Sequence, residues 1–369
     1  MNSLKQKIKE TDLTVLLICM GLSFFSVISI YSIYAKMTIL NNIRVVIVQA
    51  GASAVGVVAA FLISLIDYKE MCEMWKLHSA FAYALMVLTA VIGFAPEGTT
   101  NKAWIALPFG LSIQPSEILK LSMILTLAFF FEKNKNNVNE IKTFSRLVFA
   151  ALVPLAFVAY QKDDGTLLIF CVIVACIFFA RGVSYKVVAA GVVGLAAMSP
   201  ILWFKVLDDY QKNRILALFH PDEFSNIMWQ QNQGRIAIGS GMITGKGFLV
   251  DNHNATPLAY NDSIFSFFAE STGFVGTVLL LATILFLWMK ILSIARRSND
   301  LRGSLICVGV FAMLMAQTAI NIGMNLSLLP VIGVTLPLFS AGGTSVIVTY
   351  AAIGLVLSVA RHNPKTLFN

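Results

Sequence analysis

This sequence has few charged residues. Only 12% of its 369 residues are Asp, Glu, Lys or Arg, whereas soluble domains carry about 25%. Hydrophobic residues make up 57%, and the mean hydropathy is +0.79. Many apolar runs approach the length of about 20 residues that a helix needs to cross a bilayer. The composition therefore excludes an ordinary soluble protein and predicts an all-α integral membrane protein.

Other absences narrow the function. The five cysteines and four histidines are scattered without metal-ligand spacing, which argues against a zinc site and for reduced cysteines. No basic stripe with interleaved aromatic residues occurs, so the net charge of +8 does not indicate nucleic-acid binding. The apolar run from Leu13 to Tyr34 is long for a signal peptide and has no clear cleavage site, so we expect a retained first span.

The apolar runs predict about ten transmembrane helices in one polytopic domain over residues 1–369, with one long loop at about 206–262. In this arrangement seventeen Lys and Arg residues fall in loops on the side of both termini, against nine on the other side. By the positive-inside rule both termini are cytoplasmic and the long loop is extracytoplasmic. The predicted spans are 13–34, 45–66, 78–95, 115–132, 146–160, 165–181, 184–205, 263–290, 303–328 and 342–360.

Two acids stand out where the long loop enters the eighth span. Asp262 precedes the apolar run, and Glu270 lies eight residues further on, within it. A charge at membrane depth costs about 2.5–3.5 kcal/mol on insertion scales and persists mainly where it has a function. Asp262 has a simpler interpretation as a helix N-cap. Eight residues turn a helix by about 80° beyond two full turns, so both carboxylates can face one cavity. A carboxylate beside a low-dielectric cavity can have a raised pKa and serve as a general base.

Further charges border other spans. In IQPSEILKL, Glu117 and Lys120 share a helical face, either as a packing ion pair or as the wall of a polar cavity. In YQKDDGT, Asp163 and Asp164 either cap a helix or hold a cation or a basic side chain.

The long loop and the connection before the last span supply the remaining candidates. Arg214, Arg235 and Lys246 in the loop are either ordinary surface charges or phosphate ligands beside glycine-rich backbone. Between spans nine and ten, Pro and Gly interrupt the apolar stretch NIGMNLSLLPVIGVTLPLFSAGGTS. Non-helical backbone at this depth must be buried in protein or line a cavity, so we expect this stretch to form part of the same site.

Taken in chain order, these segments resemble one known family over nearly the whole sequence. The chain is similar to the SEDS family, the RodA, FtsW and SpoVE proteins of bacterial cell-wall synthesis. The segments that carry the resemblance are KAWIALPFGLSIQPSEILK, YQKDDGT, YQKNRI, WQQNQGRIAIGSGMITGKGF, YNDSIFSFFAE and NIGMNLSLLPVIGVTLPLFSAGGTS. The sequence departs from the family pattern at Lys162 and Asp164, which replace proline and leucine, and at Ser271, which replaces the second acid of a pair.

The resemblance implies a multi-pass protein of the bacterial cytoplasmic membrane whose outer cavity polymerises lipid II into glycan strands. It also implies a class B penicillin-binding protein as partner. Asp262 matches the essential loop aspartate and is the expected catalytic base. In the implied reaction undecaprenyl pyrophosphate is the leaving group. Because the donor is already activated by this pyrophosphate, no nucleotide is needed. The expected binding residues for lipid II and its pyrophosphate are Arg214, Lys120, Arg235 and Lys246, and the supporting acids are Glu117, Asp163 and Glu270.

A divalent cation, Mg²⁺ or Mn²⁺, is a further expectation, with Asp262, Glu117 and Asp163 as candidate ligands. Two alternatives stay open. A flippase for lipid-linked cell-wall precursors would also need buried charges beside an amphipathic cavity, and it would open on both sides of the membrane. A catalytically weakened scaffold for the penicillin-binding protein would account for the departures from the family pattern.

Overall fold

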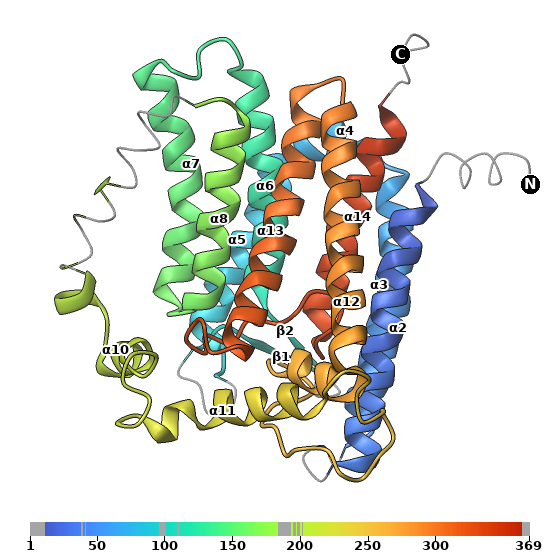
Figure 1. The fold of residues 1–369 in the computed structure, drawn as a ribbon. Coiled ribbons are helices and arrows are strands. Elements are labelled where there is room, and N and C mark those ends of the chain that lie inside the picture. Colours follow the sequence, from blue (N-terminus) through green and yellow to red (C-terminus); the bar gives the residue numbers. More distant parts are fainter. Residues whose placement is uncertain are drawn as a thin grey trace, which may run out of the picture.

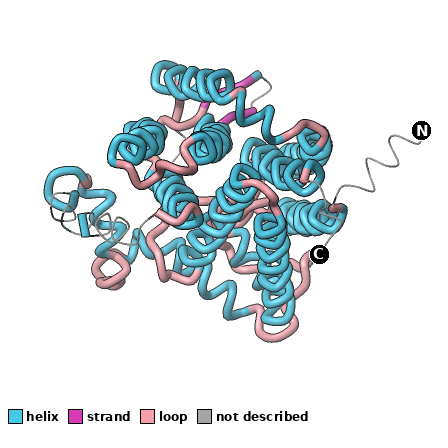
Figure 2. Tube along the Cα trace, turned by 90° about the horizontal axis from the view of Figure 1, so that it is seen from above, coloured by secondary structure: helices cyan, strands magenta, loops and turns pink. Residues whose placement is uncertain are grey.

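The structure is a computed structural model that describes residues 12–363 except 38–39, 41, 96–100, 109–110, 184–192, 195–196, 198–199 and 201. Long helices lie side by side in one bundle (Figures 1 and 2). Within the described residues, seven helices are long and apolar enough to cross a membrane. The long helices are α2 (Leu13–Lys36), α3 (Arg44–Ser64), α5 (Trp75–Ile92), α6 (Pro115–Lys133), α7 (Ile141–Tyr160), α8 (Asp164–Ala180), α12 (Ile264–Arg297), α13 (Leu301–Asn325) and α14 (Gly343–His362).

These helices match nine of the predicted spans, with bounds that differ by about seven residues at most. The other predicted span, 184–205, lies largely outside the described residues, and its last part forms a turn of π-helix at Leu202–Val206. Pro115 occupies the first turn of α6, as predicted, because its fixed φ suits a position whose N–H has no partner in the helix.

Small residues allow close helix packing inside the bundle. α3 and α14 approach so closely that a Cβ on Gly354 would lie 2.9 Å from Ala60 Cα. Gly56 of α3 likewise lies against the ring of Tyr350, which is fully buried. In lipid there is little hydrophobic drive between apolar helices, so close contact of this kind is what holds them together.

The two ends of the bundle differ (Figure 1). The end where α2 begins and α14 finishes, here the terminal end, also has the short helix α4 (Tyr68–Glu73). The opposite end, here the loop end, has α10 (Asp209–Leu216) and α11 (Ser225–Ser240), and α11 runs across the bundle. A small antiparallel hairpin of β1 (Ile105–Leu107) and β2 (Leu111–Ile113) lies there too, with Ala106 opposite Ser112.

The segment 326–342, between α13 and α14, is non-helical, as predicted. Much of its second half is buried, and side chains of the bundle satisfy its backbone. Gln49 of α3 donates from Nε2 to the Ser340 carbonyl at 3.1 Å and accepts at Oε1 from Gly342 N–H at 3.2 Å. Asn321 Nδ2 donates to the Val334 carbonyl at 2.8 Å. These bonds replace the water that the bilayer does not provide.

A glycine breaks α12 near its start. Gly273 has φ 66° and ψ −166°, a backbone conformation that favours glycine. The chain after α11 packs into this break, and Phe274 N–H donates to the Met242 carbonyl at 2.9 Å. Lys246 N–H in turn donates to the Glu270 carbonyl at 3.0 Å. The first two turns of α12 are therefore joined to the loop end rather than continuing the span directly.

Candidate active site

Asp262 lies in the turn that leads into α12, at the loop end. The helix begins at Ile264 with Ser263 in the N-cap position, so the Asp262 side chain is not used for capping. The Asp262 backbone carbonyl accepts two hydrogen bonds from α13, from Asn321 Nδ2 at 3.0 Å and Asn325 Nδ2 at 2.9 Å. These two amides, one helical turn apart, fix the position of the acid.

The Asp262 carboxyl faces a small cavity and is only 9% exposed. Its Oδ1 is buried and has no hydrogen-bond partner among the described residues. The cavity volume is about 10 Å³, roughly the space of one water molecule. Its lining comes from α11, the turn before α12, α13 and the 326–342 segment, and includes Gln230, Gln231, Ser263, Asn325 and Val331. An acid with a free oxygen at a buried cavity has the geometry of a proton acceptor.

Burial governs the protonation of Asp262. Removal from water disfavours the carboxylate and raises the pKa of Asp262 from 3.8 to about 6, while the positive charge of Arg214 opposes the rise. A carboxylate with this pKa is mostly ionised at pH 7, yet it binds a proton more strongly than an exposed aspartate does. Both properties are required of a general base that works at neutral pH.

Arg214 reaches this region from α10. Asp208 and Gln211 form a capping box that starts the helix, since each side chain bonds the backbone N–H of the other. The Arg214 guanidinium stacks on the Tyr210 ring at 4.3 Å from its centroid and donates to the Tyr210 hydroxyl. Arg214 is half-buried, and its charge acts on Asp262. The positive charge of this predicted cation therefore lowers the pKa of the predicted base, while Tyr210 holds its guanidinium.

The two departures from the family pattern in YQKDDGT both hold α10. Lys162 Nζ lies 3.4 Å from Asp208 Oδ2, and Asp164 Oδ2 accepts from Gln211 Nε2 at 2.6 Å. The residues that replace proline and leucine therefore connect the start of α8 to the helix that carries Arg214.

A second buried cluster joins α6 to the start of α8. Lys120, which is fully buried, pairs with Glu117 at 2.7 Å between Nζ and Oε1. Asp163 caps α8 by accepting from Thr166 N–H at 3.0 Å and accepts from Gln114 Nε2 at 2.8 Å. Burial raises the pKa of Asp163, and these hydrogen bonds and the charge of Lys120 oppose that rise. The structure therefore contains both the helix cap at Asp163 and the ion pair between Glu117 and Lys120 that the sequence indicated.

The 326–342 segment connects this cluster to Asp262. A Cβ on Gly165 would lie 2.6 Å from the Ile332 carbonyl oxygen, so the first turn of α8 presses directly on the segment. On its other side, the Cβ position of Gly333 lies 3.9 Å from Asp262 Oδ2. The stretch 332–334 thus lies between the two groups of charges.

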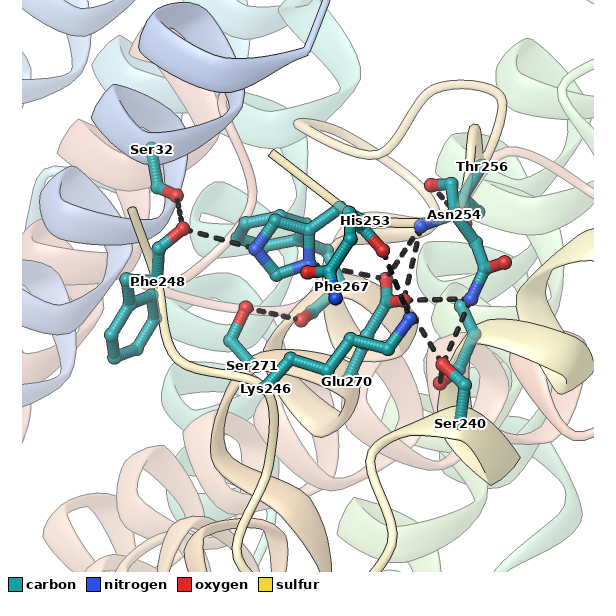
Figure 3. Close-up of polar contacts among 12 residues, drawn as sticks. Ser32, Ser240, Lys246, Phe248, His253, Asn254, Thr256, Phe267, Glu270 and Ser271 are labelled. Atoms are coloured by element: carbon teal, nitrogen blue, oxygen red, sulfur yellow. Dashed lines mark hydrogen bonds and ion pairs between the residues drawn. The ribbon is translucent and has the colours of Figure 1, made fainter. Parts of the chain in front are cut away.

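Glu270 does not share the cavity of Asp262, so the expectation that both acids face one cavity is wrong. Glu270 is fully buried and accepts at Oε1 from Lys246 Nζ at 2.6 Å and from Ser240 Oγ at 3.0 Å (Figure 3). Asn254 donates to it from both its backbone and its side chain, and His253 Nδ1 lies 3.4 Å from Oε2. The helical rotation of about 80° between the two residues did not predict this, because the chain after α11 folds over this face of α12 and supplies the hydrogen-bond partners of Glu270.

The remaining predicted residues lie apart from Asp262. Arg235 is exposed on α11, and no ion pair to it occurs within the described ranges. Lys246 is paired with Glu270. No group of three His, Cys, Asp or Glu side chains among the described residues is placed to hold a metal ion. Asp262, Glu117 and Asp163 therefore do not form a three-carboxylate metal site in this structure.

Several residues of the site were missed in the sequence. Asn321 and Asn325 hold Asp262, and Gln231 of α11 donates from Nε2 to the Met324 carbonyl at 2.9 Å and the Leu329 carbonyl at 2.8 Å. The available signal was a pair of amides four residues apart inside an apolar span, which places both on one helical face. Polar groups at such depth are costly enough to mark a site.

The fold and this site define a multi-pass helical membrane protein with a buried acid beside a cavity at one end of the bundle. The profile of FtsW, RodA and SpoVE, described as cell cycle proteins, matches residues 9–365. The chain therefore belongs to the FtsW/RodA/SpoVE family, as the resemblance predicted, and is a multi-pass protein of bacterial membranes.

Individual relatives agree with this assignment. The chain is 32% identical over 355 residues to the peptidoglycan glycosyltransferase MrdB of Escherichia coli, covering 95% of this chain and 94% of that protein. It is 31% identical over 320 residues to stage V sporulation protein E of Bacillus subtilis, covering 84% and 85%. Among solved structures it is similar to a chain of a peptidoglycan synthase complex, with TM-score 0.80 and 25% identity over 96% of this chain and 99% of that one. RodA of Thermus thermophilus has the same fold, with TM-score 0.71 and 23% identity over 96% and 98%.

Proposed function

We propose that this protein is a peptidoglycan glycosyltransferase that polymerises lipid II into glycan strands, with Asp262 as its general base. One observation carries the proposal. Asp262 has a buried, unpaired Oδ1 at a cavity and a pKa near 6, in a chain whose relatives include a peptidoglycan glycosyltransferase that matches it over 95% of its length.

Asp262 removes the proton from the 4-hydroxyl of the acceptor sugar. The oxygen then forms a bond to the anomeric carbon of the lipid-linked strand, and the bond from that carbon to the pyrophosphate breaks. The electron pair leaves with undecaprenyl pyrophosphate. The donor is already activated by its pyrophosphate, so positioning and base catalysis supply much of the rate.

Arg214 is the best-placed cation for the leaving pyrophosphate, since it is half-buried and its charge already acts on Asp262. Lys120 is enclosed with Glu117 and Asp163, so we assign this cluster to positioning the first turn of α8 against the 326–342 segment. Glu270 orients Lys246 and holds the chain after α11. Arg235 is the exposed candidate for a contact with the incoming substrate.

The loop end, with α10 and α11, is the extracytoplasmic face in this proposal, and both termini are cytoplasmic. The excess of Lys and Arg in the loops at the terminal end supports this orientation. The partner that we propose is a class B penicillin-binding protein, because a similar fold occurs in a chain of a peptidoglycan synthase complex. Co-purification after co-expression tests the partner, and accessibility of single cysteines introduced into α11 and the α6–α7 connection tests the orientation.

A requirement for Mg²⁺ or Mn²⁺ stays a prediction. When bound, such an ion would neutralise charge on the pyrophosphate. The three acids expected as its ligands are not brought together here, so no step of the mechanism above uses it. Strand formation in chelator, with each ion then added back, tests the requirement.

The experiment for the function itself uses purified protein reconstituted with lipid II. Formation of glycan strands is the expected result, and gel separation of the products measures it. Transbilayer movement of lipid II without polymer would instead support the flippase alternative. Cell growth supported by the D262A variant would support a scaffold role.

A further inference from the structure

Residues of α5, α6 and α7 line a groove near the terminal end of the bundle. Asp262 precedes α12 at the loop end, the opposite end of the bundle. Its volume is about 500 Å³, within the range of roughly 300–1,000 Å³ that is common for small-molecule sites. α5 and α7 both pack on α6, which forms the floor. The lining residues that matter here are Trp75, Ser79, Tyr83, Thr126, Lys133 and Arg146.

The groove has a charged mouth and an apolar interior. Lys133, at the last turn of α6, and Arg146, in the second turn of α7, lie toward the terminal end. Trp75 begins α5 at the same level and packs on Phe130 with 4.8 Å between ring centroids. Tyr83 is eight residues further along α5, so the groove extends about 12 Å into the bundle.

The two cations at the mouth have no acidic partner among the described residues. Lys133 Nζ lies over the Phe129 ring at 5.9 Å, and Arg146 is exposed without an ion pair. The neighbouring acid Glu132 is held by Arg302. A basic mouth without protein counter-ions attracts an anion from outside the chain. The hydroxyls of Ser79 and Thr126, 3.0 Å apart, add polar groups on the wall between mouth and interior.

We propose that this groove binds an anionic diacyl phospholipid. Its phosphate lies between Lys133 and Arg146, its glycerol region at Trp75, and its acyl chains follow the wall toward Tyr83. A free phosphate ion would leave the apolar wall of the groove uncovered. A zwitterionic lipid has no net negative charge to balance the two cations. Basic pockets between transmembrane helices at the cytoplasmic side bind anionic head groups, and tryptophan is enriched at the membrane interface.

Fluorescence quenching of Trp75 by brominated acyl chains tests the proposal on the full chain in nanodiscs. The signal of Trp75 is the difference between wild type and the W75F variant. In discs of phosphatidylcholine, we expect brominated phosphatidylglycerol to quench this signal at a mole fraction at least fivefold lower than brominated phosphatidylcholine requires. Each basic residue near the surface strengthens such binding roughly fivefold.

The K133A/R146A variant should lose the preference, since both cations of the mouth are gone. The K135A/K142A variant removes the same charge from the same end, outside the groove, and should change the preference by no more than about twofold. Equal quenching by the two lipids in wild type would overturn the proposal. So would an equal loss of preference in both variants, because that would indicate attraction by the general surface charge. These readouts do not require strand synthesis.

Discussion

The burial of Asp262 carries a cost in stability that can be measured. The pKa of Asp262 rises from 3.8 to about 6 on folding, a shift of about two units that corresponds to about 3 kcal/mol. Because the folded state raises the pKa, the protonated acid is favoured by folding. The contribution of Asp262 to the free energy of unfolding is fully present below pH 3.8 and is lost as the pH rises through 6. The D262N variant keeps the shape and removes the ionisation.

We therefore expect D262N to unfold at a higher temperature than wild type at pH 8, by several degrees, and to lose most of that gain at pH 4. Thermal unfolding of the detergent-solubilised protein, followed across this pH range, measures the difference. Asp262 Oδ1 has no partner among the described residues, so the substitution breaks no known bond of that oxygen. The exposed Asp222 provides the control variant D222N, for which no change is expected. A D262N variant that is less stable than wild type at pH 8 would show that the buried carboxylate does not destabilise the folded state.

Three further predictions concern the rate and the supporting structure. The rate of strand formation should rise with pH with a midpoint near 6, because the base must be ionised. R214A should move this midpoint to higher pH, because the guanidinium opposes the raised pKa of Asp262. An unchanged midpoint in R214A would show that the charge of Arg214 does not act on Asp262. E270Q removes the charge that pairs with Lys246. Breaking a fully buried ion pair lowers the free energy of unfolding by about 3–5 kcal/mol, and the loss should be smaller here because Lys246 is partly exposed. The variant should speed amide hydrogen exchange over residues 241–254, and unchanged exchange there would show that Glu270 does not anchor this stretch. G165A places a methyl group 2.6 Å from a carbonyl oxygen of the 326–342 segment. This should displace the segment and slow strand formation about 10- to 100-fold. The control G21A, with open space around the added methyl group, should not slow it, and equal rates in the two variants would argue against the contact.

Much of the bundle could be predicted from the sequence, because most of each long helix is an apolar run of about the length that crosses a membrane. The start of α6 at Pro115 and the non-helical segment after α13 followed from proline and glycine, whose backbone limits are local. The helices α10 and α11 were harder to predict, since they lie at the bundle end with mixed polarity and depend on tertiary contacts such as those of Gln231.

The site was predictable only in part. Asp262, Arg214 and Asp163 could be chosen because each is a charge at the end of an apolar run or in a recognisable motif. Glu270 was placed by helical rotation alone, which cannot show that Lys246 and Asn254 fold back onto it. Whether a charge is paired depends on segments far away in the chain, and the spacing within one helix carries no such information.

In the proposed mechanism Asp262 takes the proton in the sugar transfer. The direct measurement is the initial rate of glycan strand formation from purified lipid II at pH 7, compared between wild type and D262N. Loss of a general base lowers such rates by about 10²–10⁴-fold, and we expect a decrease of this size in D262N, with partial recovery in D262E. Equal rates for wild type and D262N would contradict this mechanism.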